Sequence, residues 1–341
     1  MNEIRFAILG SGYMGRTYAE CITRHNTRCK LVAVAGGRRA PGLASDYAVA
    51  FEPSYEALLD RPDVDAVLVA TPHADHRDQV IQAAEHGKQV LVEKPMATSS
   101  ADCTMMIEAC RKAGVRLEVI QTLRFRGSLA RARQIIAAGT LGQVRMVRGQ
   151  TLFTTYVVDT KPWAGLPIHG GAYLDMGVHT FDIIRFLTGA EVRRVFSHIT
   201  TFGNVPYAGL NAMSQVDLTN GAMAQHWISY QMPAPSLPNS MHRYFVVGES
   251  GLLDIDGYGK LQLGSGNHWE TVWEQPAIDY INKPLDPVRL EAFYTQTQAF
   301  VDDILDGRLS TVSGEDGRAA VALVEAAWKS SQTGQAVEMP V

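Results

Sequence analysis

The chain has 341 residues, 46% of them hydrophobic and 19% charged, and a formal net charge of −4. This length suits two domains, and the composition is that of a globular protein rather than a disordered one. The small net charge, spread without long runs of one sign, gives no reason to expect nucleic acid or an anionic membrane surface as the main partner.

The start of the chain and its cysteines bear on localisation. Residues 1–10 enter a buried-strand pattern at once, without the basic stretch, long apolar run and cleavage site of a secretory signal. No stretch reaches the roughly 18 to 20 apolar residues that cross a membrane. Cys21, Cys29, Cys103 and Cys110 match neither a zinc pattern nor a CxxC redox pair, so we expect small buried thiols in a protein of the reducing cytoplasm.

The first third of the chain alternates short apolar runs with amphipathic helical stretches. The apolar runs, expected as strands buried on both faces, are residues 4–9, 31–35, 66–70, 89–92 and 116–120. The helical stretches are residues 13–25, 54–59, 75–85 and 99–113. This α/β alternation predicts a doubly wound parallel sheet, a Rossmann domain over residues 1–122, with a ligand crevice at the carboxyl ends of its strands.

Beyond residue 122 the pattern changes. Helices are expected at residues 128–138, 173–188, 287–306 and 314–331, and a long strand at 144–151. Between residues 192 and 272 successive β-runs are separated by turn signals, of which Asn220-Gly221 is typical of a tight hairpin. We therefore expect residues 123–341 to form an α+β domain with a large, mostly antiparallel open sheet.

The first strand leads directly into Gly10-Ser11-Gly12-Tyr13-Met14-Gly15 and then into a helix. In such a GxGxxG turn Gly10 permits the tight bend, Gly12 lets the backbone approach a pyrophosphate, and Gly15 lets the helix pack closely on the strand. The helix start also offers N–H groups and a positive dipole end to phosphates. This spacing, placed between a strand and a helix, predicts a dinucleotide site.

The end of the second strand bears on the choice of cofactor. A site specific for NAD usually carries Asp or Glu there, to bond the ribose hydroxyls. This chain has Gly36-Gly37-Arg38-Arg39 instead. No carboxylate repels a 2′-phosphate, and the guanidinium groups of Arg38 and Arg39 can pair with it. We expect NADP to be preferred, with NAD as the alternative.

Two further motifs carry chemistry. Glu93-Lys94-Pro95 follows the fourth strand, where a charged pair is costly to bury without use and the proline ends the strand. Asp175 and His179 follow Gly170-Gly171 and lie four residues apart, so that a helix presents them on one face. They could bind a metal, but no third ligand stands at a telling spacing, and we expect no metal.

The segments AILGSGYMG, ATPHADH, VLVEKP and GGAYLDMGVHTFD together resemble the Gfo/Idh/MocA family of oxidoreductases. That family includes glucose-fructose oxidoreductases, inositol dehydrogenases and dimeric dihydrodiol dehydrogenases. The resemblance spans both domains and keeps the family's order of motifs. It implies that Lys94 is the catalytic lysine of the EKP motif and that Asp175 and His179 occupy the catalytic positions of DxGxH.

The motifs and the resemblance together imply wider sets of binding residues. His73, where the family often has Asn, and Gln121, at a variable position, are expected to adjust the nicotinamide pocket. The cofactor is expected to bind at Gly10, Ser11, Gly12, Tyr13, Met14, Gly15, Gly37, Arg38, Arg39, Thr71, Pro72, His73, His76, Glu93, Lys94 and Gln121. The substrate is expected at Lys94, Arg124, Trp163, His169, Asp175 and His179, with the loop 161–169 beside it. Trp163 could equally hold the domain together.

Oxidation of a secondary alcohol needs a base for the hydroxyl proton while a hydride leaves the same carbon. His179 can take that proton near neutral pH, and the Lys94 ammonium can stabilise a developing alkoxide. Asp175 can orient the substrate hydroxyls and hold Lys94 or His179 in place. Either Lys94 or His179 could be the immediate proton acceptor.

These inferences predict an NAD(P)-dependent dehydrogenase or reductase for a polyhydroxylated ring: a sugar, a cyclitol or a sugar derivative. A cis-dihydrodiol dehydrogenase of aromatic catabolism is the alternative enzyme, because it shares the vicinal diol chemistry. A non-catalytic, cofactor-sensing regulator would be expected to lack Lys94 or His179, and both are present. A mostly antiparallel sheet with one uncovered face needs a partner, so a homodimer or homotetramer is expected.

Overall fold

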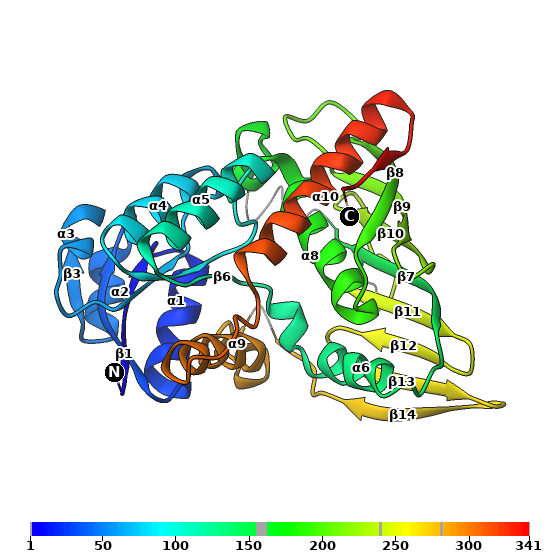
Figure 1. Ribbon diagram of the computed structural model, residues 1–341, viewed down its shortest axis with the longest axis horizontal. Helices are drawn as coiled ribbons and strands as arrows, with labels where there is room; N and C mark the ends of the chain where they lie inside the picture. Colours follow the sequence, from blue (N-terminus) through cyan, green and yellow to red (C-terminus); the bar gives the residue numbers. More distant parts are fainter. Residues whose placement is uncertain (1, 155–161, 239–240, 280–281, 341) are drawn as a thin grey trace. The chain divides into compact units, whose positions relative to one another are not determined.

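The computed structural model describes residues 2–154, 162–238, 241–279 and 282–340. The chain divides into two compact units. The first comprises residues 1–122 and 279–318, and the second comprises residues 123–278 and 319–341. Each unit is built around its own sheet, and both sheets are seen in Figure 1.

The sheet of the first unit has six parallel strands in the order β3-β2-β1-β4-β5-β6. They are β1 (Ile4–Leu9), β2 (Cys29–Ala35), β3 (Ala50–Glu52), β4 (Ala66–Val69), β5 (Gln89–Val92) and β6 (Leu117–Val119). The five expected strands are present, and four successive residues of β4 are fully buried, as a sheet covered on both faces requires. The expected Rossmann fold is confirmed. β3 was not expected, because it is a three-residue edge strand whose Phe51 is exposed.

Helices connect these strands, and their ends follow local capping rules. They are α1 (Tyr13–Glu20), continued by the π-helical turn η1 (Cys21–His25), then α2 (Ala40–Asp46), α3 (Tyr55–Leu59), η2 (His73–Asp75), α4 (His76–Glu85) and α5 (Ser100–Ala113). The Ser99 hydroxyl accepts a hydrogen bond from the backbone N–H of Asp102 at the start of α5. Gly114 ends that helix in the left-handed conformation. The short helix α2, of seven residues, was not expected.

Helix α9 (Pro287–Leu305) belongs to the first unit. Its buried residues Leu290, Phe293 and Phe300 join the core that also contains Phe6 and Tyr18. The rings of Phe6 and Phe300 lie 5.9 Å apart, and Tyr18 meets Phe293 edge to face at the same centroid distance. The expected second domain, residues 123–341, is therefore interrupted by residues 279–318. Helical periodicity reveals an apolar stripe, but it does not say which sheet the stripe covers.

The second unit contains a nine-stranded sheet in the order β14-β13-β12-β11-β7-β10-β9-β8-β15. Its strands are β7 (Val144–Leu152), β8 (Val192–Thr200), β9 (Asn211–Leu218), β10 (Met223–Ser229), β11 (Arg243–Gly248), β12 (Leu252–Asp256), β13 (Lys260–Ser265), β14 (His268–Glu274) and β15 (Val337–Glu338). Neighbouring strands pair antiparallel except β7 and β10, which confirms the expected, mostly antiparallel sheet. The expected hairpin at Asn220-Gly221 joins β9 to β10, with Gly221 at φ +85°.

Helices lie against this sheet. They are α6 (Gly127–Ala137), α8 (Gly171–Thr188) and α10 (Gly314–Thr333), with the 3₁₀ turns η3 (Thr122–Phe125), η4 (Pro162–Gly165) and η5 (Pro167–His169). α8 packs on β7 and β10 and is almost wholly buried, while α6 packs on β12, β13 and β14 (Figure 1). Along β8 and β9 buried residues alternate with exposed ones. The exposed positions of the sheet carry large apolar side chains at Met146, Phe196, Met213, Met223 and Trp269.

Candidate active site

The turn after β1 is shaped by steric limits on its three glycines. Gly10 has φ +112°, and a Cβ there would lie 2.4 Å from the carbonyl oxygen of Ala70. A Cβ on Gly15 would lie 2.0 Å from the carbonyl oxygen of Gly10, so the helix start could not approach the turn. A Cβ on Gly12 would meet no heavy atom within 4 Å. Open space at Gly12 beside the start of α1 is what a dinucleotide pyrophosphate needs, so these residues fit that group.

The end of β2 approaches the same turn. Gly36 and Gly37 both have φ +81°, and a Cβ on Gly37 would lie 2.7 Å from the hydroxyl oxygen of Ser11. Arg38 and Arg39 follow with exposed side chains, and the structure gives neither guanidinium a protein partner among the described residues. Two cations therefore lie next to the glycine turn, in the segment where an adenine ribose binds in Rossmann folds.

His76 joins the end of β4 to the end of β5. It is fully buried, with Nδ1 2.9 Å from the carbonyl oxygen of Pro95 and Nε2 2.9 Å from that of Thr71. Burial lowers the pKa of its imidazole. Each ring nitrogen thus lies beside a backbone carbonyl, and His76 links two loops of the expected cofactor site. His73 is buried beside it, with ring centroids 6.0 Å apart.

The end of β5 places a carboxylate and a lysine together. Glu93 is 7% exposed and accepts hydrogen bonds from the Tyr18 hydroxyl at 2.8 Å and from the backbone N–H of Lys94 at 3.0 Å. These bonds fix the backbone from which the partly exposed Lys94 side chain extends. Burial raises the pKa of the Tyr18 hydroxyl, and the neighbouring Glu93 carboxylate raises it further. Glu93 is therefore a support of the loop that carries Lys94.

The first unit contains a cation that sequence reasoning missed. Arg289, in the first turn of α9, is 2% exposed and lies with its guanidinium carbon 4.6 Å from the ring centroid of Tyr13. It donates a hydrogen bond to the Thr17 hydroxyl at 3.1 Å. This places a buried positive charge beneath the glycine turn, from a residue 276 positions after Tyr13 in the sequence. No motif could have found it. Gln121, by contrast, is buried as expected, and its backbone N–H donates to the side chain of Gln296.

In the second unit α8 begins at two glycines with positive φ, Gly170 and Gly171. A Cβ on Gly171 would lie 2.8 Å from the carbonyl oxygen of Ala208, so this close approach needs glycine. One turn further, Asp175 is fully buried, and the Tyr230 hydroxyl lies 3.5 Å from its Oδ2. His179 follows on the same face and is 7% exposed. The helix therefore presents the expected carboxylate and imidazole together.

His179 packs against a second histidine. The rings of His179 and His242 meet edge to face with centroids 5.8 Å apart. His242 Nδ1 lies 3.1 Å from the hydroxyl oxygen of Thr151, which is fully buried on β7. Phe153 contacts the His242 ring and stacks on Tyr230 with centroids 5.3 Å apart. These surroundings of α8 come from β7 and β10 and from the segment before β11, and sequence reasoning did not find them.

The remaining expected substrate residues differ in what they contact. The Arg124 guanidinium binds both carboxylate oxygens of buried Asp182 on α8, at 2.8 and 2.5 Å, which forms an ion pair inside the second unit. Trp163 and His169 are partly buried and meet edge to face with centroids 5.2 Å apart. Residue 161, the start of the expected substrate loop, lies outside the described residues.

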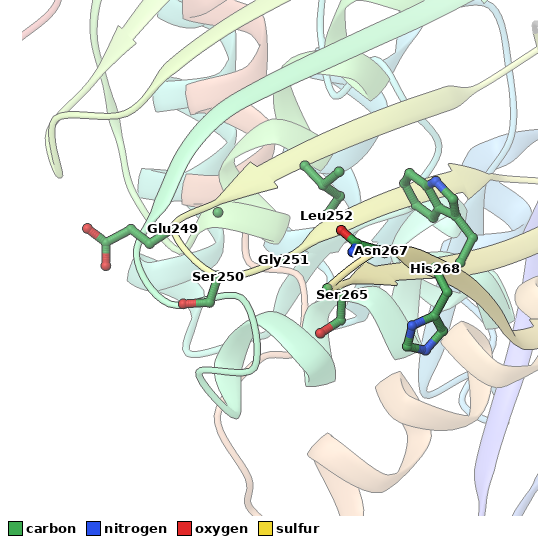
Figure 2. A pocket seen from close by; sticks show the side chains of 11 residues that line it. Glu249, Ser250, Gly251, Leu252, Ser265, Asn267 and His268 are labelled. Carbon is green, nitrogen blue, oxygen red and sulfur yellow. The ribbon is translucent and has the colours of Figure 1, made fainter.

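Two surface depressions of the second unit lie away from all these residues. One, of 300 Å³, lies between the β11–β12 turn and the β13–β14 hairpin and is lined by Glu249, Ser265, Asn267, His268 and Trp269 among others (Figure 2). The other, of 490 Å³, lies beside Arg145, Met146 and Met223. Neither depression contains a residue of the expected site.

Two further properties of the described residues bear on other functions. They contain no group of three or more His, Cys, Asp or Glu side chains placed to hold a metal ion. None of their helices combines the length and apolar character that crossing a membrane requires.

Comparisons with known proteins agree with this arrangement. The family model of oxidoreductases with an NAD-binding Rossmann fold matches residues 4–121, and the model of the GFO/IDH/MocA C-terminal domain matches residues 129–254. The scyllo-inositol 2-dehydrogenase (NAD(+)) of Bacillus subtilis (strain 168) is 28% identical over 350 residues, covering 100% of this chain and 97% of that protein.

Two other proteins extend the comparison. The 1,5-anhydro-D-fructose reductase of Ensifer adhaerens is 30% identical over 295 residues, covering 84% of this chain and 83% of that protein. The crystal structure of aldose-aldose oxidoreductase from Caulobacter crescentus matches with a TM-score of 0.85 and 28% identity, covering 99% of this chain and 100% of that one.

Proposed function

The chain belongs to the Gfo/Idh/MocA oxidoreductase family, and we propose that it transfers a hydride between a nicotinamide dinucleotide and a secondary alcohol or ketone of a polyhydroxylated ring. The ring is a sugar, a cyclitol or a sugar derivative. The names of the inositol dehydrogenase, the anhydrofructose reductase and the aldose oxidoreductase support this substrate class. The observation that carries the proposal is the buried pair Asp175 and His179 on one face of α8.

The cofactor would be held by the glycine turn and the start of α1, with its adenine ribose near the end of β2. When bound, its nicotinamide ring would accept or supply the hydride. We propose that Lys94 and the pair on α8 act on the same substrate carbon. The Lys94 ammonium stabilises negative charge on the substrate oxygen, which is worth most where water is excluded.

His179 is proposed to take the hydroxyl proton during oxidation and to return it during reduction, because an imidazole titrates near neutral pH. Asp175 orients the substrate hydroxyls from its fully buried position. Lys94 is the second candidate for the immediate proton acceptor. The two assignments differ in the pH dependence of kcat/KM, since a lysine that acts as a base must first lose its charge.

We propose that NADP is preferred to NAD. The support is the absence of an acidic residue in Gly36-Gly37-Arg38-Arg39 and the exposed guanidinium groups of Arg38 and Arg39. A 2′-phosphate can accept charge-assisted hydrogen bonds from them. The Bacillus subtilis relative carries NAD(+) in its name, so the preference is to be measured in this chain itself.

We also propose a homodimer or homotetramer in which the open sheet of the second unit is covered by another subunit. The exposed Met146, Met213 and Met223 support this, because exposed methionines on a sheet pack well against a partner. A substitution of Met213 by Lys is expected to weaken the assembly, which light scattering after size-exclusion chromatography measures. We propose a cytoplasmic location, where the thiols of its four buried cysteines stay reduced.

Two other activities have less support. None of the relatives reported above is named for a dihydrodiol, and nothing in the described residues favours an aromatic diol over a sugar ring. A non-catalytic, cofactor-sensing regulator has no need of Lys94 and of the buried pair Asp175 and His179.

The test is a set of initial rates of reduced-cofactor formation with NADP and NAD across sugars, cyclitols and cis-dihydrodiols, and of the reverse reaction with the corresponding ketones. Turnover of sugars or cyclitols, faster with NADP, is the expected result. Turnover of dihydrodiols alone would contradict the substrate class, and faster turnover with NAD would contradict the cofactor preference. Binding of cofactor without turnover in either direction would favour the regulator.

A further inference from the structure

The contact between His179 and His242 supports an inference about the proposed proton transfer, and this inference rests on the proposed function. Both rings are nearly inaccessible to water, with His242 3% and His179 7% exposed, and they meet edge to face at 5.8 Å. Such a contact fixes the plane of each ring relative to the other. It also brings together two groups that would repel each other if both were protonated.

The backbone of His242 is held in an uncommon conformation. Its φ is +57°, in the left-handed region that few side chains adopt, although His, Asn and Asp do so more often than others. Its carbonyl oxygen accepts a hydrogen bond from the N–H of Gly257 at 3.0 Å. A Cβ on Gly257 would lie 2.8 Å from that oxygen, so the segment after β12 fits closely against it. Strain held in place by neighbouring segments is typical of functional sites.

The ring of His242 is held as firmly as its backbone. Thr151 Oγ1 lies 3.1 Å from Nδ1, and the rings of Phe153 and Tyr258 lie against it with centroids 6.2 and 5.8 Å away. Two segments thus contact the His242 ring: β7 through Thr151, and the turn after β12 through Tyr258. The orientation of His242 is therefore set by the sheet, and His179 packs against a fixed surface.

Charged and titratable groups from several elements surround the pair. On α8 Asp175 lies four residues before His179, with the Tyr230 hydroxyl 3.5 Å from its Oδ2, and Asp182 lies three residues after it. From the sheet side the Arg126 guanidinium lies 5.0 Å from the ring centroid of Tyr258. Asp256 accepts a hydrogen bond from the backbone N–H of Tyr258.

The ion pairs farther along these elements are internally balanced. Arg243, next to His242 in the chain, donates to both carboxylate oxygens of Asp254. On α8, Asp182 is paired with Arg124. Neither pair therefore supplies a net charge that would dominate the titration of the histidines.

We propose that His242 is a positioning residue for His179: it fixes the plane of the His179 ring and restricts the two rings to a single proton between them. His179 would then accept the substrate proton only while His242 is neutral. The proton taken from the hydroxyl binds to the histidine pair, which holds only one proton at a time. It is released to solvent or returned to substrate before the next turnover. No other reactant is required.

A direct test follows the ring protons of isotopically labelled histidines in the full-length protein by NMR as the pH is varied. In the wild-type chain the two rings are expected to titrate as a coupled pair. With His242→Phe or His179→Phe, the ring that protonates second in the wild type is expected to titrate about one to two pH units higher, from Coulomb's law at this separation and an effective dielectric constant of about 20. Unchanged titration of both rings in both variants would overturn the coupling.

The control is His226→Phe. His226 is a fully buried histidine of β10 that packs edge to face on Phe181 of α8 with centroids 4.7 Å apart, and it has no ring contact with His179 among the described residues. This substitution should leave the titration of His179 and His242 unchanged. A shift as large as that caused by His242→Phe would show that any buried histidine beside α8 has the same effect, and would also overturn the proposal.

Kinetics test the positioning role separately. His242→Asn keeps the left-handed backbone and removes the ring, whereas His242→Phe keeps a ring and removes the nitrogens. We expect kcat to fall about tenfold or more in His242→Asn and less in His242→Phe, with KM and cofactor affinity nearly unchanged. Equal kcat in wild type and His242→Asn would overturn the positioning role. If the wild type proved inactive on every polyol, the proposed function would fail while the NMR titration still decided the coupling.

Discussion

The glycine turn of the first unit and the face of α8 in the second unit are built in different ways. At the turn the backbone forms the binding surface: Gly10 and Gly15 are required by contacts of 2.4 and 2.0 Å, and Gly12 leaves the space for a ligand. On α8 the proposed functional surface is made of side chains, Asp175 and His179, each buried against a residue far away in the sequence.

The difference shows in how the two histidines of these regions are held. His76, in the first unit, has both ring nitrogens within 2.9 Å of backbone carbonyl oxygens, and burial lowers its pKa. His179 packs instead on another imidazole, that of His242. A ring fixed by two carbonyls is suited to holding loops together, whereas a ring packed on a titratable neighbour is suited to exchanging a proton. The predictions below test this division.

The largest effect is expected at Lys94, whose proposed role is to stabilise charge on the substrate oxygen. Lys94→Ala should lower kcat/KM at least about 1000-fold, because the charge on the substrate oxygen loses its stabilising ammonium. The dissociation constant of the cofactor, measured by fluorescence titration, should stay within about twofold. Lys30→Ala, at an exposed lysine of β2, is the control and should retain activity. An active Lys94→Ala enzyme would show that the lysine has no catalytic role.

Glu118 is a buried carboxyl group outside both regions, and it tests whether a buried ionisable group without a proposed function affects stability alone. Glu118 on β6 is 1% exposed, and burial, followed by the charge of Asp303, raises its pKa to about 7. Because the folded pKa lies above the unfolded one, the protonated form favours folding. Its contribution is fully present below about pH 4.5 and is lost as the pH rises towards 7.

Glu118→Gln removes this titration. We expect the variant to gain up to about 3 kcal/mol of stability relative to wild type when the comparison moves from pH 4 to pH 8. Thermal unfolding at both pH values measures this difference, and activity should be unaffected. Parallel pH dependence in the two proteins would contradict the assignment of the raised pKa to Glu118.

Two alanine substitutions distinguish the roles of the glycines. Gly15→Ala places a Cβ against the backbone oxygen of Gly10 and should cost about 1–3 kcal/mol of stability, a fall in Tm of several degrees. Gly12→Ala enters open space, so Tm should not change while the cofactor binds at least about tenfold more weakly. Calorimetry without and with cofactor measures both. A destabilised Gly12→Ala protein would show that the open space has another use.

The smallest effect is expected at the end of β2. Replacing Arg38 and Arg39 together by Ala should weaken NADP binding about tenfold and leave NAD binding within about twofold, since only NADP carries the 2′-phosphate. Isothermal titration with both cofactors makes the comparison. Arg24→Ala, at an exposed arginine of the same unit, is the control. Equal weakening of both cofactors would instead indicate a contact to adenine.

The difference between the two regions also explains what could be predicted from sequence. The parallel sheet, the antiparallel sheet and the hairpin at Asn220-Gly221 follow from local patterns of burial and turn residues, and the structure confirms them. The three-residue strand β3 leaves no such pattern. α9 was expected in the second domain but belongs to the first unit. Its apolar stripe, with Phe293 and Phe300, does not reveal from the sequence that it packs against Phe6.

The same reasoning applies to the site. The glycine turn could be predicted because its function depends on backbone conformation, which glycine spacing encodes. The placement of Arg289 below Tyr13 and of His242 beside His179 could not, because each is a contact between segments far apart in the chain. For Arg124 the resemblance implied a substrate contact, and only the structure shows its ion pair with Asp182.

The central claim is that Lys94 and the pair on α8 perform hydride transfer on a polyhydroxylated ring. The most direct measurement follows deuterium from the ring carbon of labelled sugars and cyclitols into the reduced cofactor, with wild type and Lys94→Ala compared under cofactor saturation. The account predicts label in the reduced cofactor for at least one sugar or cyclitol with the wild type and essentially none with Lys94→Ala. Bound cofactor that never acquires label from any such substrate, or equal transfer by both proteins, would contradict it.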